Sequence, residues 1–405
     1  MIDEKTAQFI EAHKTDDVRD LMLKYGNRQD IDARTAAVQI RGWQIARKKL
    51  PEWAETEGII YPEHISMEQC SSEQTSHYKA VLAERLCGEE RERFADLTGG
   101  LGADTAAIGR NFGHTVYVER NEELCRAAEN NLPKMGISDI RIVCDDSENV
   151  LNKMESQDLI FIDPARRDEN GGKTVEICDC TPDVSALNDQ IRNKCRFAMI
   201  KLSPMLEIKS AEKELKGIKE IHVVSVDGEC KETLFVLEGH QTSSSEEPII
   251  VCTNIVRGEI QELSFRRKEE LEAECRYAST LGHYLYEPNA SILKGGGLKF
   301  AAQKYGVYKL SQNSHLYTSD VPVEDFQGRI FEIIDECAFS PKDMKAMMKG
   351  EKKANITVRN FPATVADIRN RCKLKEGGDI YLFATTMADG RHVIIKCRKM
   401  NAKQT

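Results

Sequence analysis

Seven short apolar segments between residues 93 and 239 constrain the fold of this chain more than any other feature. They read RFADLT, TVYVER, IRIVCDD, DLIFIDP, FAMIKLSP, IHVVSVDG and ETLFVLEG. Helix-like stretches separate the first five, and they are long enough to serve as crossover helices. Strands joined in this way run parallel, with helices on both faces of the sheet. The pattern therefore predicts a doubly wound α/β sheet.

The last two of these segments are joined differently. Only a few residues around Asp227–Gly228 separate them, which is too short for a crossover and typical of a β-hairpin. The seventh strand is therefore expected to run antiparallel to the others. The predicted fold class is α/β, a Rossmann-like sheet of seven strands, six parallel and one antiparallel.

The regions on either side of this sheet predict further domains. Residues 1–90 have helical periodicity, HQTSSSEEP at 240–248 has the composition of a linker, and strand-like and helix-like segments alternate again after it. We therefore expect a helical N-terminal region, the sheet domain and two small α+β segments. Their predicted bounds are 1–90, 91–245, 246–328 and 329–405.

A glycine-rich turn, TGGLGADT, follows the first predicted strand. A P-loop would end in Gly-Lys-Ser/Thr, whereas Gly102 is followed here by Ala103 and Asp104. A dinucleotide site would read G-x-G-x-x-G in an all-parallel sheet, whereas position 105 is Thr and a hairpin is predicted. S-adenosylmethionine is the third common ligand of such turns, and we expect it to be the cofactor.

Acidic residues end the first three predicted strands, and the carboxyl ends of parallel strands form the edge where open α/β sheets bind ligands. Asp96 suits the cofactor's ammonium group, Glu119 its ribose hydroxyls, and Asp145 or Asp146 its adenine amino group. Glycine in the turn allows the backbone to approach a ligand closely. The residues expected to contact the cofactor are Gln74, Thr75, Asp96, Thr98, Gly99, Gly100, Gly102, Asp104, Thr105, Glu119, Arg120, Asp145 and Asp146.

Charge is distributed unevenly along the 405 residues. The net charge is −9, but residues 341–405 carry 15 Lys and Arg against 6 Asp and Glu, so this end is +9 and the preceding 340 residues are −18. A basic end on an acidic protein favours a polyanionic partner such as nucleic acid, and a solvated lysine-rich face is the alternative. Arg359 and Arg398 are among the predicted phosphate contacts.

Membrane, secreted and zinc proteins have signatures that this sequence lacks. No apolar run approaches the roughly 18 residues of a membrane span, and the N-terminal residues have no hydrophobic signal core. The 13 cysteines form no C-x-x-C pair, which is the spacing typical of zinc sites. We expect a cytoplasmic protein without membrane or metal, and make no prediction of its oligomeric state.

These motifs together resemble those of class I S-adenosylmethionine-dependent methyltransferases. DLTGGLGADT, VYVERN, VCDDSE and IDPARRD are similar to the first four motifs of that class, in order. The chain also resembles, nearly end to end, a bacterial methyltransferase family with a C-terminal THUMP-like domain, in segments such as EQCSSEQTSHYKA, KLSPML, VSVDGECKE, LYEPNASILKGGGL and ITVRNFP. This resemblance implies a ferredoxin-like segment, a THUMP-like domain and, because THUMP domains are associated with RNA binding, an RNA substrate.

Asp163 ends the fourth predicted strand, where the transferred methyl group is expected to point. Amine-methylating enzymes of this class carry Asp/Asn-Pro-Pro-aromatic, in which the ring stacks on a flipped base. Here Asp163-Pro164 is followed by Ala-Arg-Arg. An arginine plane stacks on bases and binds phosphate, and pairing with nearby acids is the alternative. The expected catalytic residues are Asp163, Pro164, Arg166 and Arg167, and the expected substrate contacts are Lys201, Ser203, Arg359 and Arg398.

The sequence as a whole predicts an S-adenosylmethionine-dependent methyltransferase that acts on a base of a structured RNA, either an rRNA or a tRNA. Two alternatives remain open. One is a methyltransferase that acts on a protein or a small molecule. The other is a non-catalytic RNA-binding protein that keeps the cofactor site.

Overall fold

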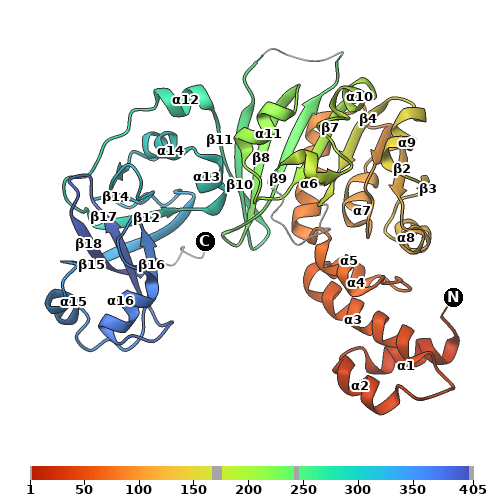
Figure 1. The fold of residues 1–405 in the computed structure, drawn as a ribbon, viewed down its shortest axis with the longest axis horizontal. Helices are drawn as coiled ribbons and strands as arrows, with labels where there is room; N and C mark the ends of the chain where they lie inside the picture. The colour runs from red at the N-terminus through yellow and green to blue at the C-terminus, as the bar shows by residue number, and fades with distance from the viewer. Residues whose placement is uncertain (1, 167–175, 241–245, 401–405) are drawn as a thin grey trace. The chain divides into compact units, whose positions relative to one another are not determined.

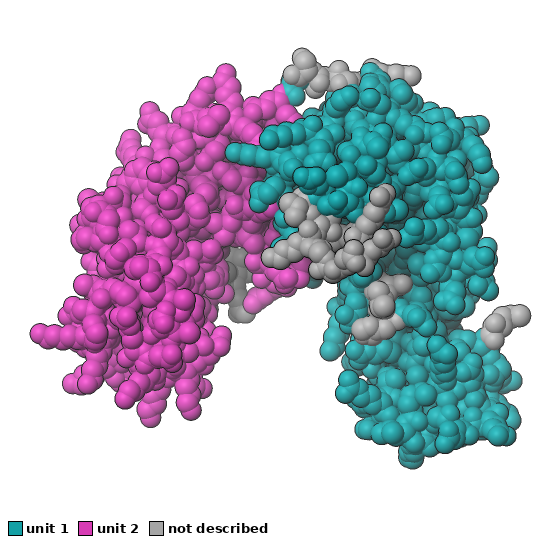
Figure 2. All heavy atoms as spheres, viewed as in Figure 1, with its two compact units in different colours: residues 1–221, 232–246 teal, residues 222–231, 247–405 magenta. Residues whose placement is uncertain are grey.

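The computed structural model describes residues 2–166, 176–240 and 246–400 (Figure 1). The chain divides into two compact units (Figure 2). Unit 1 contains residues 1–221 and 232–246, and unit 2 contains residues 222–231 and 247–405. Among the described helices, none combines the length and the apolar character that a membrane span requires.

Helices fill the N-terminal part of unit 1, as the sequence predicts. Aspartate or serine side chains start several of them by accepting hydrogen bonds from backbone N–H groups of the first turn, as Asp32 and Ser72 do. Ile40, Ala46 and Leu50 are buried at the predicted helical spacing. The helices are α1 (Glu4–His13), α2 (Val18–Tyr25), α3 (Ala33–Lys49), α4 (Pro51–Glu55), α5 (His64–Gln69) and α6 (Glu73–Cys87).

Five parallel strands form one half of the main sheet, in the order β3-β2-β1-β4-β7. They are β1 (Arg93–Asp96), β2 (His114–Glu119), β3 (Ile140–Cys144), β4 (Gln157–Ile162) and β7 (Cys195–Leu202). Helices alternate with them along the chain, namely α7 (Ala103–Gly109), α8 (Glu122–Lys134), α9 (Ser147–Lys153), α10 (Asn188–Asn193) and α11 (Ile208–Glu214). The predicted parallel, doubly wound arrangement of the first five strands is confirmed.

The predicted hairpin is also present. β8 (Ile218–Val226) and β9 (Glu229–Glu238) are neighbours in the sheet, and Asp227 and Gly228 between them both have positive φ, 50° and 83°. Consecutive positive φ values produce the twist that suits a two-residue hairpin turn. β9 pairs antiparallel with β7, so the seventh predicted strand has the predicted direction.

The predicted total of seven strands is wrong, because the sheet has nine. β10 (Ile249–Val256) and β11 (Glu259–Arg266) form a second hairpin, and β10 pairs with β8. A strand at the edge of a sheet leaves its backbone groups open to further pairing, and β10 uses that edge of β8. A separate two-stranded sheet joins β5 (Ala165–Arg166) to β6 (Cys180–Thr181), and a short 3₁₀ helix covers Ile177–Asp179.

Unit 2 contains a seven-stranded sheet in the order β13-β14-β12-β15-β18-β17-β16. Its strands are β12 (Tyr284–Pro288), β13 (Tyr308–Lys309), β14 (Tyr317–Ser319), β15 (Gly328–Ala338), β16 (Asn355–Arg359), β17 (Ile380–Thr386) and β18 (His392–Lys399). Its helices are α12 (Arg267–Glu272), α13 (Ala290–Gly295), α14 (Leu298–Tyr305), α15 (Pro341–Met347) and α16 (Val365–Cys372). In the basic end, α15 is followed by β16, α16 and the antiparallel pair β17–β18.

Candidate functional site

The glycine-rich turn connects β1 to α7 and packs closely against β2. The N–H of Gly99 donates to Val118 O at 2.8 Å, and a Cβ on Gly99 would lie 2.1 Å from a ring carbon of Tyr117. Gly99 is therefore required by packing within the protein. Gly100 differs, because it has a φ of 53° and a Cβ there would meet only Thr98 O, at 3.8 Å. The turn thus leaves open space at Gly100.

Asp96 ends β1 beneath this turn and is 1% exposed. Its carboxylate accepts hydrogen bonds from Thr98 N at 3.0 Å and from Thr105 Oγ1 at 2.6 Å. Burial raises the pKa of this carboxyl to about 7, against the opposing effect of these two bonds. A cationic partner would stabilise the ionised form of this carboxyl, because it offsets the cost of the buried negative charge. Asp96 is therefore well suited to bind a cation.

The predicted acids of the second and third strands lie at the same edge of the sheet. Glu119 accepts Gly100 N at 3.1 Å and Asn121 N at 2.9 Å, so its carboxylate reaches the turn. It is level with Cys144, which immediately precedes Asp145. The Asn149 side chain and the backbone of Asp146 lower the pKa of Asp145. Asp146 and Arg120 are exposed.

Asp163 follows β4 and is tied to the turn through Thr98. Its N–H donates to Thr98 Oγ1 at 2.6 Å, and its carboxylate forms an ion pair with Lys201 near the end of β7. The structure thus brings together Asp163 and Lys201, which the sequence assigns to one crevice. Pro164 is buried, and Ser203 accepts Met205 N at 3.2 Å. The backbone of Arg166 pairs in β5, and Arg167 lies outside the described residues.

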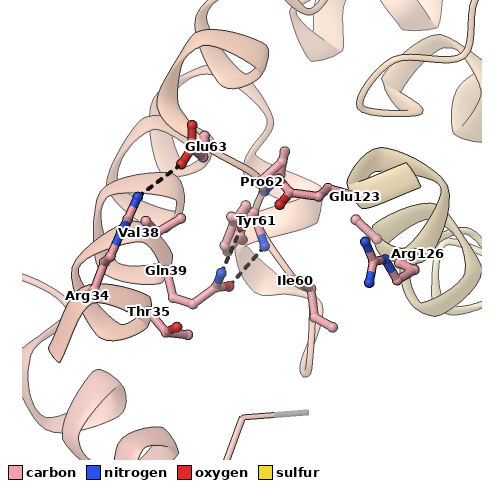
Figure 3. Close-up of a pocket in the computed structure, with 11 residues that line it drawn as sticks. Arg34, Thr35, Val38, Gln39, Ile60, Tyr61, Pro62, Glu63, Glu123 and Arg126 are labelled. Carbon is pink, nitrogen blue, oxygen red and sulfur yellow. Dashed lines mark hydrogen bonds and ion pairs between the residues drawn. The ribbon is translucent and has the colours of Figure 1, made fainter. Parts of the chain in front are cut away.

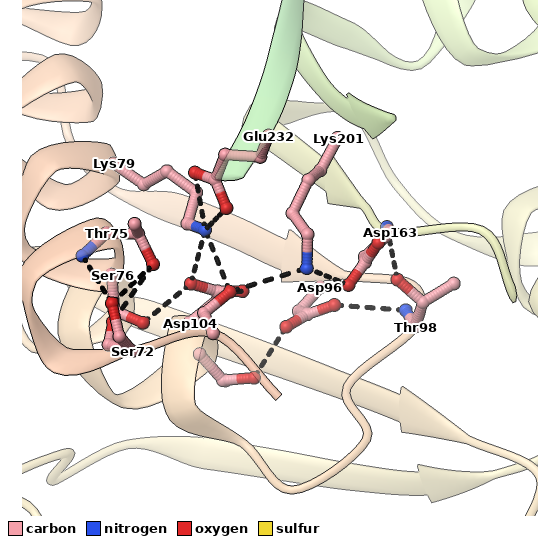
Figure 4. A network of polar contacts seen from close by, with 12 residues as sticks. Ser72, Thr75, Ser76, Lys79, Asp96, Thr98, Asp104, Asp163, Lys201 and Glu232 are labelled. Atoms are coloured by element: carbon pink, nitrogen blue, oxygen red, sulfur yellow. Dashed lines mark hydrogen bonds and ion pairs between the residues drawn. The ribbon is translucent and has the colours of Figure 1, made fainter. Parts of the chain in front are cut away.

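A buried charged network connects this site to α6, and sequence reasoning missed most of it (Figure 4). Lys79 is 0% exposed and donates to Asp104 at 3.0 Å, to both Glu232 oxygens at 2.9 and 3.0 Å, and to Ser71 Oγ at 2.9 Å. Burial alone would raise the pKa of Asp104, but Lys79 and Lys201 lower it below its ordinary value. Burial raises the pKa of Glu232.

Sequence reasoning missed Lys79 and Glu232 because each lies in an apolar stretch, HYKAVL and KETLFVL. A lysine on the core side of a helix and a glutamate inside a buried strand were the available signals, since such charges are buried only when paired. The same helix carries the predicted Gln74 and Thr75. Gln74 is exposed, and Thr75 donates to Ser72 O at 3.1 Å. Instead, Ser71 and Ser76 bind Asp104, at 2.6 and 2.8 Å.

The predicted phosphate contacts Arg359 and Arg398 belong to unit 2. Arg359 on β16 binds Glu287 at 3.0 Å, and Glu287 also pairs with Arg329. Arg398 on β18 is exposed. Arg398 thus presents its side chain to solvent, whereas Arg359 already has a carboxylate partner.

A separate pocket of about 530 Å³ lies among the N-terminal helices and α8 (Figure 3). Gln39 and Tyr61 exchange two hydrogen bonds at its wall, Gln39 Nε2 to Tyr61 O at 2.8 Å and Tyr61 N to Gln39 Oε1 at 2.9 Å. None of the predicted site residues lines this pocket. Within the described part of the chain, no group of three His, Cys, Asp or Glu side chains is arranged to hold a metal ion.

Three family models match the chain. They are described as conserved hypothetical protein 95 over residues 78–191, ferredoxin-like domain over residues 284–326 and THUMP domain-like over residues 328–399. The last two matched segments share the seven-stranded sheet of unit 2 through the β12–β15 pairing.

Two known proteins similar to this chain carry the word methyltransferase in their names. The protein-L-isoaspartate O-methyltransferase of Thermotoga maritima is 24% identical over 145 residues, which are 35% of this chain. The chain spans only 45% of that curated relative. The crystal structure of a candidate methyltransferase from Porphyromonas gingivalis W83 is 32% identical, covers 99% of this chain and 100% of its own, and has a TM-score of 0.87. This chain therefore belongs to the same family of class I methyltransferases with a C-terminal THUMP-like domain.

Proposed function

We propose that this protein is an S-adenosylmethionine-dependent methyltransferase that acts on a structured RNA such as an rRNA or a tRNA. The observation that carries the proposal is the convergence of Asp96, Glu119 and Asp163 on one glycine-rich turn. Thr98 lies in that turn and hydrogen-bonds to the last residue of β1 and to the first residue after β4, donating its own N–H to Asp96 and accepting from Asp163 N.

The residues around the turn fit the chemistry of S-adenosylmethionine. Asp96 is a buried carboxyl with a raised pKa, which suits an ammonium partner. Glu119 faces the turn at Gly100, where open space exists, and a carboxylate there can accept ribose hydroxyls. Asp145 is the proposed partner of the adenine amino group, with Asp146 as the alternative. The polar atoms of Thr105 and Asp104 already have protein partners. In this proposal Thr105 therefore orients Asp96, and Asp104 orients α6.

Bound S-adenosylmethionine supplies an electrophilic methyl group. The protein's own task is to align the acceptor and to remove its proton. Asp163 can accept that proton, and the hydrogen bond from Asp163 N to Thr98 fixes its backbone against the turn. The sequence predicts a base as the acceptor.

Two observations support RNA as the substrate class. A THUMP-like model matches residues 328–399, and the last 65 residues carry a net charge of +9. Lysine and arginine side chains bind phosphate and release counterions, so RNA affinity should fall steeply with salt. Exposed Arg398 is the proposed phosphate contact, and Arg359 is a weaker candidate because Glu287 already neutralises it.

Calorimetric titration with S-adenosylmethionine tests the cofactor assignment. The wild-type protein is expected to bind one equivalent, and Asp96→Ala is expected to bind much more weakly. Wild-type affinity in Asp96→Ala would remove the assignment. The RNA assignment is tested by binding total RNA across a salt series. Absence of RNA binding at low salt would instead favour a protein or small-molecule substrate.

A further inference from the structure

The two ends of the charged network in Figure 4 differ in exposure. At one end, the Lys79 and Glu232 side chains are 0% and 3% exposed and satisfy each other. At the other end, the Lys201 and Asp163 side chains are 13% and 35% exposed and form an ion pair. A molecule arriving at the sheet edge can therefore reach the pair of Lys201 and Asp163, whereas the pair of Lys79 and Glu232 is closed to it.

The Lys201–Asp163 pair lies next to the proposed cofactor site. Ile162 is level with Ile200 in the parallel β4–β7 pairing, so Asp163 and Lys201 follow at the same height. The backbone N–H of Asp163 is fixed by Thr98 of the glycine-rich turn, and Lys201 Nζ also lies 3.4 Å from Ser71 Oγ. Both charges are thus held in place at the carboxyl ends of the strands.

Lys201 provides a permanent positive charge at this position. Burial alone would lower the pKa of its ammonium group, but Asp163, Asp104 and Glu232 together raise that pKa above its ordinary value. An amine that attacks a methyl group becomes positively charged, so a fixed ammonium beside it opposes the reaction. A hydroxyl that loses its proton becomes negatively charged, and the same ammonium stabilises that charge.

We propose, building on the function proposed above, that the acceptor is a hydroxyl oxygen, namely the ribose 2′-hydroxyl of RNA, and that Lys201 and Asp163 both contact it. A 2′-hydroxyl is carried by every internal nucleotide of an RNA chain. Its methylation needs no stacked base, which agrees with Asp-Pro-Ala-Arg in place of the Asp-Pro-Pro-aromatic motif. This acceptor replaces the base that the sequence predicts.

The proposed step balances in atoms and charge. The O–H bond of the acceptor breaks, its proton passes to the Asp163 carboxylate, and a new bond joins the oxygen to the methyl carbon. The carbon–sulfur bond of the donor sulfonium breaks, and its electron pair stays on sulfur. Lys201 keeps its proton and holds the oxygen through a charge-assisted hydrogen bond. Asp163 then releases its proton to water, which reaches its partly exposed side chain.

The position of the methyl group in the product tests this proposal. Purified protein is incubated with methyl-tritiated S-adenosylmethionine and RNA from cells that lack the gene, and the RNA is then hydrolysed in alkali. Alkaline cleavage needs a free 2′-hydroxyl, so the label is expected in alkali-resistant dinucleotides. Label in mononucleotides would place the methyl on a base, which overturns this inference and leaves the proposed function intact. Label in protein, or none in RNA, would overturn both.

Substitution of Lys201 gives an independent test. Lys201→Met is expected to slow RNA methylation by at least about 100-fold, and Lys201→Arg is expected to restore part of the rate because it keeps the charge. Affinity for S-adenosylhomocysteine is expected to stay close to wild type in both. Because Lys201→Met leaves Asp163 without its ion-pair partner, the rates are compared well below the unfolding temperature of each variant. Lys209→Met, at an exposed position of the nearby helix α11, is the matched control. Wild-type or faster methylation by Lys201→Met would contradict the proposal, because an amine acceptor gains from removal of the cation.

Discussion

Replacement of Asp96 with Asn removes one buried charge while nearly preserving the shape of the side chain. Asp96 is 1% exposed, and burial raises its pKa from an ordinary 3.8 to about 7. The folded protein therefore binds more protons than the unfolded chain between about pH 4 and pH 7. It follows that wild-type stability falls as the pH rises through this window. Asn carries no charge and escapes this loss.

The size of the effect follows from the shift in pKa. Each pKa unit corresponds to about 1.4 kcal/mol, so a shift of roughly three units makes the ionised Asp96 carboxylate cost the fold about 4 kcal/mol well above pH 7. At pH 5 a part of this cost, about 2 kcal/mol, is already present, because the unfolded chain is ionised there. The stability advantage of Asp96→Asn over wild type should therefore grow by about 2–3 kcal/mol between pH 5 and pH 8.

Urea unfolding of the ligand-free proteins at pH 5 and pH 8 measures this difference. In a second measurement, calorimetry of S-adenosylhomocysteine binding at pH 6 in two buffers of different ionisation enthalpy counts released protons. The wild type should release close to one proton, because the ligand ammonium stabilises ionised Asp96, whereas Asp96→Asn should release none and bind more weakly. A pH-independent stability difference, or equal binding by the two proteins, would refute this account of Asp96.

Three further substitutions test other parts of the structure. Gly99→Ala should lower stability by about 1–3 kcal/mol in urea unfolding, because its Cβ would lie 2.1 Å from the Tyr117 ring. The same substitution should cost less in a Tyr117→Ala background, and equal stability of Gly99→Ala and wild type would contradict the predicted clash. Lys79→Met should lower the free energy of unfolding by about 3–5 kcal/mol, because it leaves buried carboxylates unpaired. This loss should be smaller when Glu232→Gln is also present. Strictly additive losses in the double variant would mean that the two residues are not coupled. Arg398→Ser should weaken RNA binding and reduce its salt slope by about one unit, with Arg359→Ser having less effect; an unchanged slope would exclude Arg398 as a phosphate contact.

Local sequence signals were sufficient for the strand ends and the hairpin. Asp96, Glu119 and Asp163 each close an apolar run, and a parallel sheet places such ends at one edge whatever the details of packing. The Asp227–Gly228 turn was equally predictable from the sequence, because two consecutive residues with positive φ form a two-residue hairpin turn. These features depend on the backbone and on neighbours in sequence, which a single sequence contains.

Features that depend on contacts between residues far apart in the sequence could not be predicted. Lys79 and Glu232 are 153 positions apart, and although each stretch signals a buried charge, neither indicates which residue is its partner. The membership of β10 and β11 in the main sheet escaped prediction for a similar reason. The linker composition at 240–248 marks a break in the chain, yet β10 returns to the open edge of β8. Gly99 shows a third limit, since its role depends on the Tyr117 ring of another strand.

Transfer of a labelled methyl group to RNA tests the central claim most directly. RNA from cells that lack the gene should accept label from S-adenosylmethionine in the presence of the wild-type protein, and RNA from wild-type cells should accept little, because its sites are already methylated. Asp163→Ala should bind the cofactor and transfer nothing. If the wild-type protein binds S-adenosylmethionine but labels neither RNA, the assignment of this protein as an RNA methyltransferase is wrong.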